Sequence, residues 1–146
     1  MDEQDFQSAA LIYQDLLLSE LPADLRVEVQ TNLAAALCAA GQDELVPKDK
    51  AISLLDAARV VLVDLLQHYK IGEEPASWAS GRANLALVHL ARYRLTDGDQ
   101  DVLFAHLALD GTEEALRRAG DLEMLGWIQS IRDYLVELRD RRSSSR

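Results

Sequence analysis

The polar side chains with the clearest spacing in this sequence are two asparagines, each followed by leucine and alanine. Asn32 and Asn84 begin the repeated triplet Asn-Leu-Ala inside two alanine- and leucine-rich segments, residues 29–41 and 81–93. Asparagine is a mediocre residue in a helix interior, so its return at the same place needs a physical reason. A carboxamide both donates and accepts hydrogen bonds, which suits an extended peptide backbone or a neighbouring helix. The sequence leaves ligand binding and structural support as the two interpretations.

The other residues that carry chemistry form no catalytic or metal-binding pattern. His68, His89 and His106 fall in different predicted helices without a His-x-x-x-His or Glu-x-x-His spacing, so we expect no metal site. Cys38 is the single cysteine and has no base or cation beside it in sequence, which predicts a packing residue rather than a nucleophile. No glycine-rich phosphate loop is present, and the carboxylates fall at helix starts and on polar faces. We therefore expect a protein that is not an enzyme and uses no cofactor.

Length and composition predict one all-α domain. The chain has 146 residues, of which 49% are hydrophobic, and only 3 are proline. That is enough apolar surface for a core, and the abundance of leucine and alanine favours helices. No apolar run approaches the ~18 residues of a membrane span, and the acidic N-terminus lacks a secretion signal, so a cytoplasmic protein is expected. The net charge of −10 disfavours nucleic acid and suits a partner with basic character.

Apolar residues recur at helical spacing along six stretches, separated by short turns rich in glycine, proline and acidic residues. Gly111 lies inside the fifth stretch, where it predicts either a close helix contact or a local kink. In the last, Trp127, Ile131, Tyr134 and Leu138 are expected on one face. Because the turns are short, successive helices should pack antiparallel. The predicted helices cover residues 5–20, 24–41, 49–69, 77–95, 102–119 and 122–139.

The two Asn-Leu-Ala segments alternate with predicted helices that carry mostly small residues at spacings of four and then three. Together with Leu33, Ala34, Leu37 and Gly41 of the first segment, this alternation resembles the tetratricopeptide repeat family. The resemblance implies antiparallel helical hairpins stacked as a short right-handed superhelix, in one domain over residues 1–140. Small residues would let the helices approach closely. The alternating sets are Ala51, Leu55 and Ala58 after the first copy, and Ala108, Thr112 and Ala115 after the second.

In that family the first helix of each repeat lines a concave face that binds other polypeptides, and asparagines at this position hold the backbone of the bound peptide. The resemblance extends that role to Asn32 and Asn84. By their phase, Arg82, Arg92 and Arg94 are expected to point elsewhere. The implied binding surface consists of Asn32, Asn84, Glu28, Thr31, Ala35, Ser80 and Leu87, with Cys38, Ala39, Ala83, Leu90 and Ala91 around them.

The expected function is therefore that of a non-enzymatic scaffold, adaptor or chaperone-like module that binds a peptide or protein, without nucleic acid or membrane. The alternative is a structural module that forms homo-dimers through its end helices, with Trp127 and Tyr134 at the interface. Residues 141–146, rich in arginine and serine, are expected to form a flexible tail.

Overall fold

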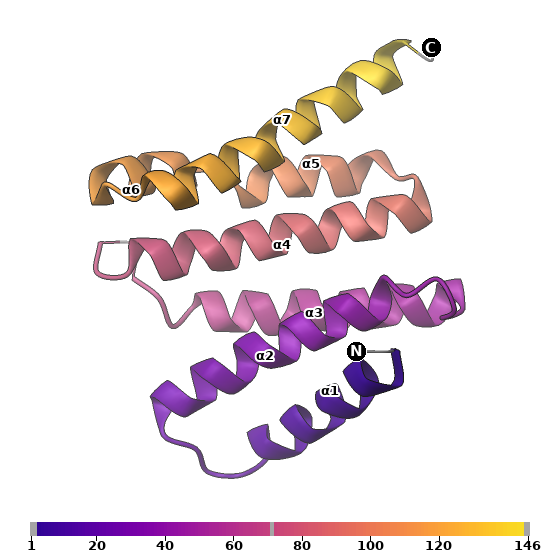
Figure 1. The fold of residues 1–146 in the computed structure, drawn as a ribbon, viewed down its shortest axis with the longest axis vertical. Helices are drawn as coiled ribbons and strands as arrows, with labels where there is room; N and C mark the ends of the chain where they lie inside the picture. Colours follow the sequence, from indigo (N-terminus) through magenta and orange to yellow (C-terminus); the bar gives the residue numbers. More distant parts are fainter. Residues whose placement is uncertain (1–2, 71, 145–146) are drawn as a thin grey trace.

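The computed structural model describes residues 3–70 and 72–144, and all regular structure in these ranges is α-helical, as predicted. Helices α1 to α5 run back and forth, and the helices stack from α1 at one end of the molecule to α7 at the other (Figure 1). Each apolar face is thereby covered by the next helix. The elements are α1 (Glu3–Leu17), α2 (Ala23–Gly41), α3 (Lys48–Leu66), α4 (Pro75–Thr96), α5 (Asp99–Ala108), α6 (Thr112–Ala119) and α7 (Leu122–Ser144).

Prolines mark the starts of the central helices. Pro22 and Pro47 immediately precede α2 and α3, and Pro75 is the first residue of α4. Proline suits these positions because its φ is already helical and the first helical N–H groups have no partner within the helix. At the other end, Asp97 closes α4 and Gly120 closes α6, both in the left-handed region.

The segment predicted as one helix over residues 102–119 is two helices, because Gly111 breaks it. Gly111 has φ 82°, a left-handed conformation that a helix interior does not contain. The Thr112 hydroxyl donates a 2.6 Å hydrogen bond to the carbonyl oxygen of Leu109, which helps to close the turn. Both α5 and α6 pack on α4. The break thus redirects the chain while keeping both pieces against the same helix.

The alternating small residues are buried between helices, as the repeat pattern predicts. Ala58 and Ala86 are 0% exposed, and Leu55 beside them is also fully covered. At Gly41, an added Cβ would lie 2.8 Å from Cγ of Leu55, so α2 and α3 are in close contact there. The other buried alanines of the pattern are Ala34, Ala51, Ala108 and Ala115.

The buried face of α7 is rotated from the predicted one. Trp127 is 37% exposed, although the sequence places it with Ile131 and Leu138, which are buried. Tyr134 is only partly buried, against the edge of the core. The aromatic residues therefore flank the buried stripe of α7 instead of forming it. That stripe consists of Leu125, Ile128, Ile131, Leu135 and Leu138.

Helix α7 continues to Ser144, into the segment expected to form a flexible tail. Arg142 donates a 2.8 Å hydrogen bond to the Tyr93 hydroxyl oxygen, and it forms ion pairs with Asp97 and Asp99. These contacts tie the last turns of α7 to the junction of α4 and α5. Residues 145 and 146 of the expected tail lie outside the described part of the chain.

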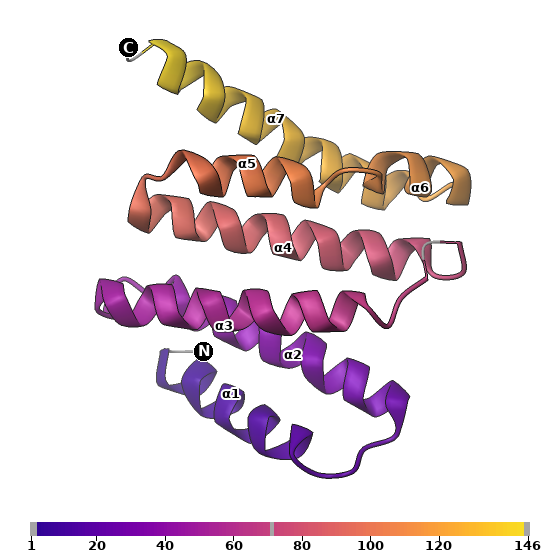
Figure 2. The same ribbon diagram turned by 180° about the vertical axis from the view of Figure 1, so that it is seen from behind.

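The helices form two faces. Helices α2 and α7 lie in front of α3 and α5 in Figure 1 and behind them in Figure 2, where the molecule is turned by 180°. Helix α3 packs closely against both α2 and α4, whereas α2 and α4 touch only lightly. A cavity lies between the helices of the face formed by α2, α4 and α7.

Candidate functional site

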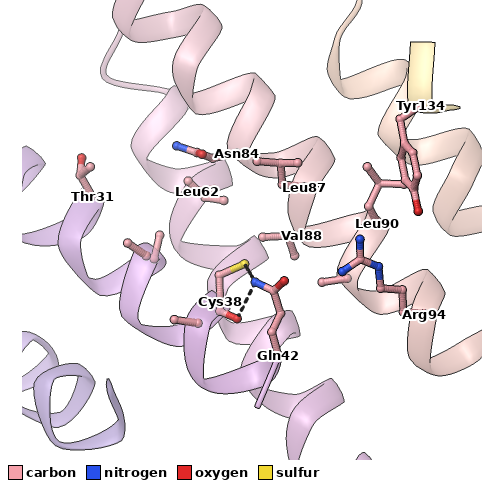
Figure 3. A pocket seen from close by; sticks show the side chains of 14 residues that line it. Thr31, Cys38, Gln42, Leu62, Asn84, Leu87, Val88, Leu90, Arg94 and Tyr134 are labelled. Carbon is pink, nitrogen blue, oxygen red and sulfur yellow. Dashed lines mark hydrogen bonds between the residues drawn. The ribbon is translucent and has the colours of Figure 1, made fainter. Parts of the chain in front are cut away.

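A cavity of about 460 Å³ opens between α2, α4 and α7, and we call it the α2–α4–α7 groove (Figure 3). Most of its lining is apolar, and polar side chains surround the apolar floor. The lining residues are Thr31, Ala34, Ala35, Cys38, Ala39 and Gln42 from α2 and its C-terminal cap, Leu62 from α3, Asn84, Leu87, Val88, Leu90, Ala91 and Arg94 from α4, and Tyr134 from α7.

Small residues on α2 make the groove hollow. Ala34, Ala35 and Ala39 occupy positions where larger side chains would fill the space between α2 and α4. Behind them, the buried side chain of Leu62 forms part of the floor, and Val88 is also buried. The groove therefore follows from alanine at the i, i+1 and i+5 positions of one helix, facing branched residues on the next.

The polar side chains at the groove fall into two groups. Thr31 and Cys38 are satisfied locally: the Thr31 hydroxyl donates to the Val27 carbonyl at 2.8 Å, and Gln42 Nε2 donates to the Cys38 carbonyl at 3.2 Å. By contrast, the side chains of Asn84, Arg94 and Tyr134 make no hydrogen bond or ion pair with any other described residue. Their donors and acceptors are free for a bound molecule.

Cys38 is a weakly reactive thiol that lies in the groove. Burial raises the pKa of Cys38, which outweighs the opposite effect of the hydrogen bond from Gln42 Nε2 to its Sγ at 3.4 Å. A raised pKa keeps the thiol protonated at neutral pH, and the thiolate is the nucleophilic form. Cys38 therefore contributes an apolar surface here, in line with its prediction as a packing residue.

Several residues of the predicted binding surface meet in this groove. Thr31, Ala35, Asn84 and Leu87 line it, as do Cys38, Ala39, Leu90 and Ala91. The structure places the others elsewhere: Asn32 and Glu28 are exposed on α2 outside the groove, Ser80 is half-buried outside it, and Ala83 is buried in the core.

The two asparagines of the repeated triplet differ in their position relative to the groove. Asn84 lines it, whereas Asn32 is exposed on α2 outside it. Other pairs of the same alignment, such as Ala35 with Leu87 and Ala39 with Ala91, line the groove on both helices.

Sequence reasoning placed Arg94 away from this surface, and that prediction was wrong. Arg94 lies three residues after Ala91 and seven after Leu87, so helical spacing could have placed it in the groove. The other two arginines do point elsewhere. Arg82 donates to the Ala108 carbonyl at 2.7 Å, and Arg92 pairs with carboxylates on the far side of α4.

A second cavity, of about 660 Å³, continues the groove past Arg94 toward the connector between α2 and α3. Gln42, Ala91 and Arg94 line both cavities, so the two form one continuous depression. Asp43 and Glu44 line the far part, together with Lys48. Exposed Glu28 lies one helical turn before Thr31 on α2. Carboxylates therefore lie beyond the Gln42 end of the apolar centre, beside one lysine.

No group of three or more His, Cys, Asp or Glu side chains among the described residues is arranged to hold a metal ion. Within the same residues, no helix has the length and apolar character needed to cross a membrane. The chain matches no protein family, no curated protein and no solved structure. The geometry of the groove is therefore the basis for assigning a function.

Proposed function

We propose that the α2–α4–α7 groove binds an extended segment of another polypeptide, with apolar side chains at its centre and basic residues on its flanks. The observation that carries this proposal is the combination of an apolar floor with Asn84, Arg94 and Tyr134, whose side chains have no partner among the described residues. An apolar floor without such polar groups would suit a helix face or a lipid chain equally well. Polar groups without the floor would lack the main source of binding free energy.

The floor would supply most of the affinity. Burying one leucine-sized side chain contributes about 1.5–3 kcal/mol, and a cavity of about 460 Å³ has room for such an anchor with adjacent backbone. Leu87 is half-buried, so part of its surface remains for a ligand to cover. Alanine at positions 34, 35 and 39 allows the segment to approach the backbone of α2 closely.

The free polar groups match an extended backbone. Asn84 can donate to a peptide carbonyl and accept from a peptide N–H, and the Arg94 guanidinium can donate to carbonyl oxygens. Each such hydrogen bond contributes about 0.5–1.5 kcal/mol. They would fix the direction and register of the segment, while the apolar floor alone would let it slide.

Charge complementarity supports basic flanks. The chain carries a net charge of −10, Asp43 and Glu44 line the far part of the depression, and Glu28 is exposed on α2 one turn before Thr31. A segment with lysine or arginine on either side of its apolar centre would meet these carboxylates and be steered toward them. The lining itself contains neither carboxylate nor imidazole, which favours binding over proton-transfer chemistry and so a non-enzymatic role.

The superhelix of the tetratricopeptide repeat family remains part of this proposal. Helices α2, α4 and α7 line the groove, and α3, α5 and α6 contribute only Leu62 to it. The resemblance to the tetratricopeptide repeat family implies the same separation between lining and non-lining helices, because the first helix of each hairpin in that family lines the concave face. In this assignment α1 is the second helix of an incomplete first hairpin, and α7 is the first helix of a closing one.

The proposal can be tested with peptides selected from a random phage-displayed library on the immobilised protein, then resynthesised with a fluorophore. Anisotropy titrations should show that Asn84→Ala weakens a selected peptide about two- to tenfold, the equivalent of one hydrogen bond. Asn32→Ala is the matched control, because Asn32 is exposed outside the groove, and it should bind like wild type. Equal effects of the two substitutions, or glutamates flanking the apolar centre in place of lysines or arginines, would contradict the proposal.

Self-association is the second candidate, and exposed apolar residues at both ends of the stack favour it. On α1, Leu11 is 64% and Ile12 60% exposed, and Trp127 on α7 is 37% exposed. A second copy of the chain could cover such faces. Light scattering on a chromatographed sample decides between the two: a monomer at about 100 µM would reject the oligomer, given the µM affinities of weak specific complexes.

A further inference from the structure

A separate cavity of about 290 Å³ lies between α3, α4 and α5, and we call it the His89 hollow. By helical phase its α4 residues, His89 and Arg92, lie on the side of α4 opposite to Leu87 and Arg94. The His89 hollow is therefore separate from the α2–α4–α7 groove, and a role for it does not depend on the function proposed for the groove. The lining residues are Arg59, His89, Arg92, Gln100, Asp101 and Phe104.

The Asp101 carboxylate sets the tautomer of His89. Asp101 Oδ1 lies 3.1 Å from His89 Nδ1 and 3.2 Å from Arg92 Nε, and Oδ2 accepts a 3.1 Å hydrogen bond from the Thr96 hydroxyl. An ionised carboxylate can only accept, so the proton of the neutral imidazole resides on Nδ1. The lone pair is then on Nε2, which has no hydrogen-bond partner among the described residues.

His89 is nine-tenths buried, with 10% of its side chain exposed. Burial lowers the pKa of His89; Asp101 acts in the opposite direction, and Arg59 and Arg92 add to the lowering. At neutral pH the hollow therefore contains a neutral imidazole whose free Nε2 is a hydrogen-bond acceptor. A ligand that donates a hydrogen bond to this nitrogen would add a contact that the described residues do not provide.

Two further side chains define the rest of the hollow. Arg59 is exposed and forms no hydrogen bond or ion pair with another described residue, whereas Arg92 is held by Asp56 and Asp101. The ring of Phe104 is 45% exposed and its centroid lies 5.4 Å from that of His89. The hollow thus offers a free guanidinium, a free acceptor nitrogen and an aromatic surface.

We propose that the His89 hollow binds a phosphomonoester on a small apolar or aromatic body. A phosphomonoester has its second pKa near about 6, so near pH 6 about half of it is the monoanion, which supplies both the anionic oxygens that Arg59 requires and an O–H that can donate to Nε2 of His89. The body of the ester would pack on the exposed ring of Phe104. A sulfate monoester has the same shape and anionic oxygens but carries no proton, so it leaves Nε2 without a donor.

The test uses phenyl phosphate, with phenyl sulfate as the matched ligand, and follows the His89 imidazole nitrogens by NMR at pH 6, where about half of the phenyl phosphate is the protonated monoanion. Phenyl phosphate should shift the His89 signals saturably, and phenyl sulfate should bind at least about tenfold more weakly, the loss of one charge-assisted hydrogen bond. Arg59→Ala should abolish saturation. Arg117→Ala, which removes an exposed arginine of α6 outside the hollow, should bind like wild type. If phenyl phosphate and phenyl sulfate bound equally well, or if Arg59→Ala and Arg117→Ala had equal effects, the hollow would bind an adventitious ion only and the proposal would be overturned.

Phe104→Ala and a change of ligand identify the source of the ester. The substitution should weaken phenyl phosphate about three- to tenfold, the range of one aromatic contact, and leave inorganic phosphate unchanged. A phosphotyrosine pentapeptide that binds no tighter than phenyl phosphate would assign a free small-molecule ester, and one that binds tenfold tighter would assign a phosphorylated side chain. A pentapeptide without the phosphate that binds equally well would overturn the proposal.

Discussion

The contact between α2 and α3 behind the groove can be tested by adding one methyl group at Gly41. Gly41 is the last residue of α2 and is buried. A Cβ there would lie 2.8 Å from Cγ and 2.9 Å from Cδ2 of Leu55, and 3.1 Å from the Ala51 carbonyl oxygen. Leu55 is 0% exposed, and the carbonyl belongs to the backbone of α3. Gly41→Ala therefore forces the two helices apart.

The size of the effect follows from two opposing contributions. Overpacking of a tight contact costs about 1–3 kcal/mol, and replacing glycine by alanine in a helix returns up to about 1 kcal/mol, less at the last residue. We expect Gly41→Ala to lower the free energy of unfolding by about 1–2 kcal/mol. For a chain of this length the melting temperature would fall by about 2–8 °C.

Urea denaturation followed by circular dichroism measures this change, with Gly126→Ala as the control. Gly126 is an exposed residue of α7, and a Cβ there meets nothing within 4 Å. Gly126→Ala should therefore stabilise the protein by about 0.5–1 kcal/mol through helix propensity alone. If Gly41→Ala were as stable as wild type with an unchanged denaturant slope, the close contact between α2 and α3 would be refuted.

Three further predictions concern other parts of the fold. Burial lowers the pKa of His89 in the folded state from its ordinary value of 6.5. The contribution of His89 to the free energy of unfolding should therefore be fully present above about pH 6.5 and decrease as the pH drops below it. His89→Gln should reduce this dependence of the free energy of unfolding on pH, measured by denaturation between about pH 7 and 5. Leu135 is 0% exposed, and Leu135→Ala should cost about 2–5 kcal/mol in urea denaturation, while Val136→Ala on the exposed side should cost under about 1 kcal/mol. Arg142→Gln removes the contacts with Tyr93 and Asp97, and should speed amide hydrogen exchange over residues 139–143 while leaving the melting temperature nearly unchanged.

Sequence reasoning could predict the fold class and most helix boundaries because the signals are local. Pro22, Pro47 and Pro75 mark helix starts, and leucine and alanine recur at helical spacing between them. The sequence predicts a close contact or a kink at Gly111, but its left-handed φ depends on how Leu109 and Thr112 pack in the folded chain. The predicted face of α7 is wrong because helical spacing fits two neighbouring faces, and the aliphatic residues Ile128 and Leu135 are buried in place of Trp127 and Tyr134.

The candidate site was predictable in part. Thr31, Ala35, Asn84 and Leu87 could be placed on one surface because helical phase defines a direction relative to each helix's own core. The different positions of Asn32 and Asn84 relative to the groove could not be read from the Asn-Leu-Ala repeat, since they depend on the packing between hairpins. Tyr134 was missed for a related reason: its contact with the groove requires the position of α7, which is distant in sequence from α2.

The most direct measurement on the central claim is the alkylation rate of Cys38 by N-ethylmaleimide with and without a selected peptide. Cys38 is the single cysteine of the chain and lines the groove, so it reports on occupancy without a new substitution. The control is the double variant Cys38→Ser/Asn32→Cys, which moves the thiol to an exposed position of α2 outside the groove. We expect the peptide to slow alkylation of Cys38 in proportion to the bound fraction and to leave the control rate unchanged. Alkylation of Cys38 at the same rate in a saturated complex would contradict binding in the α2–α4–α7 groove.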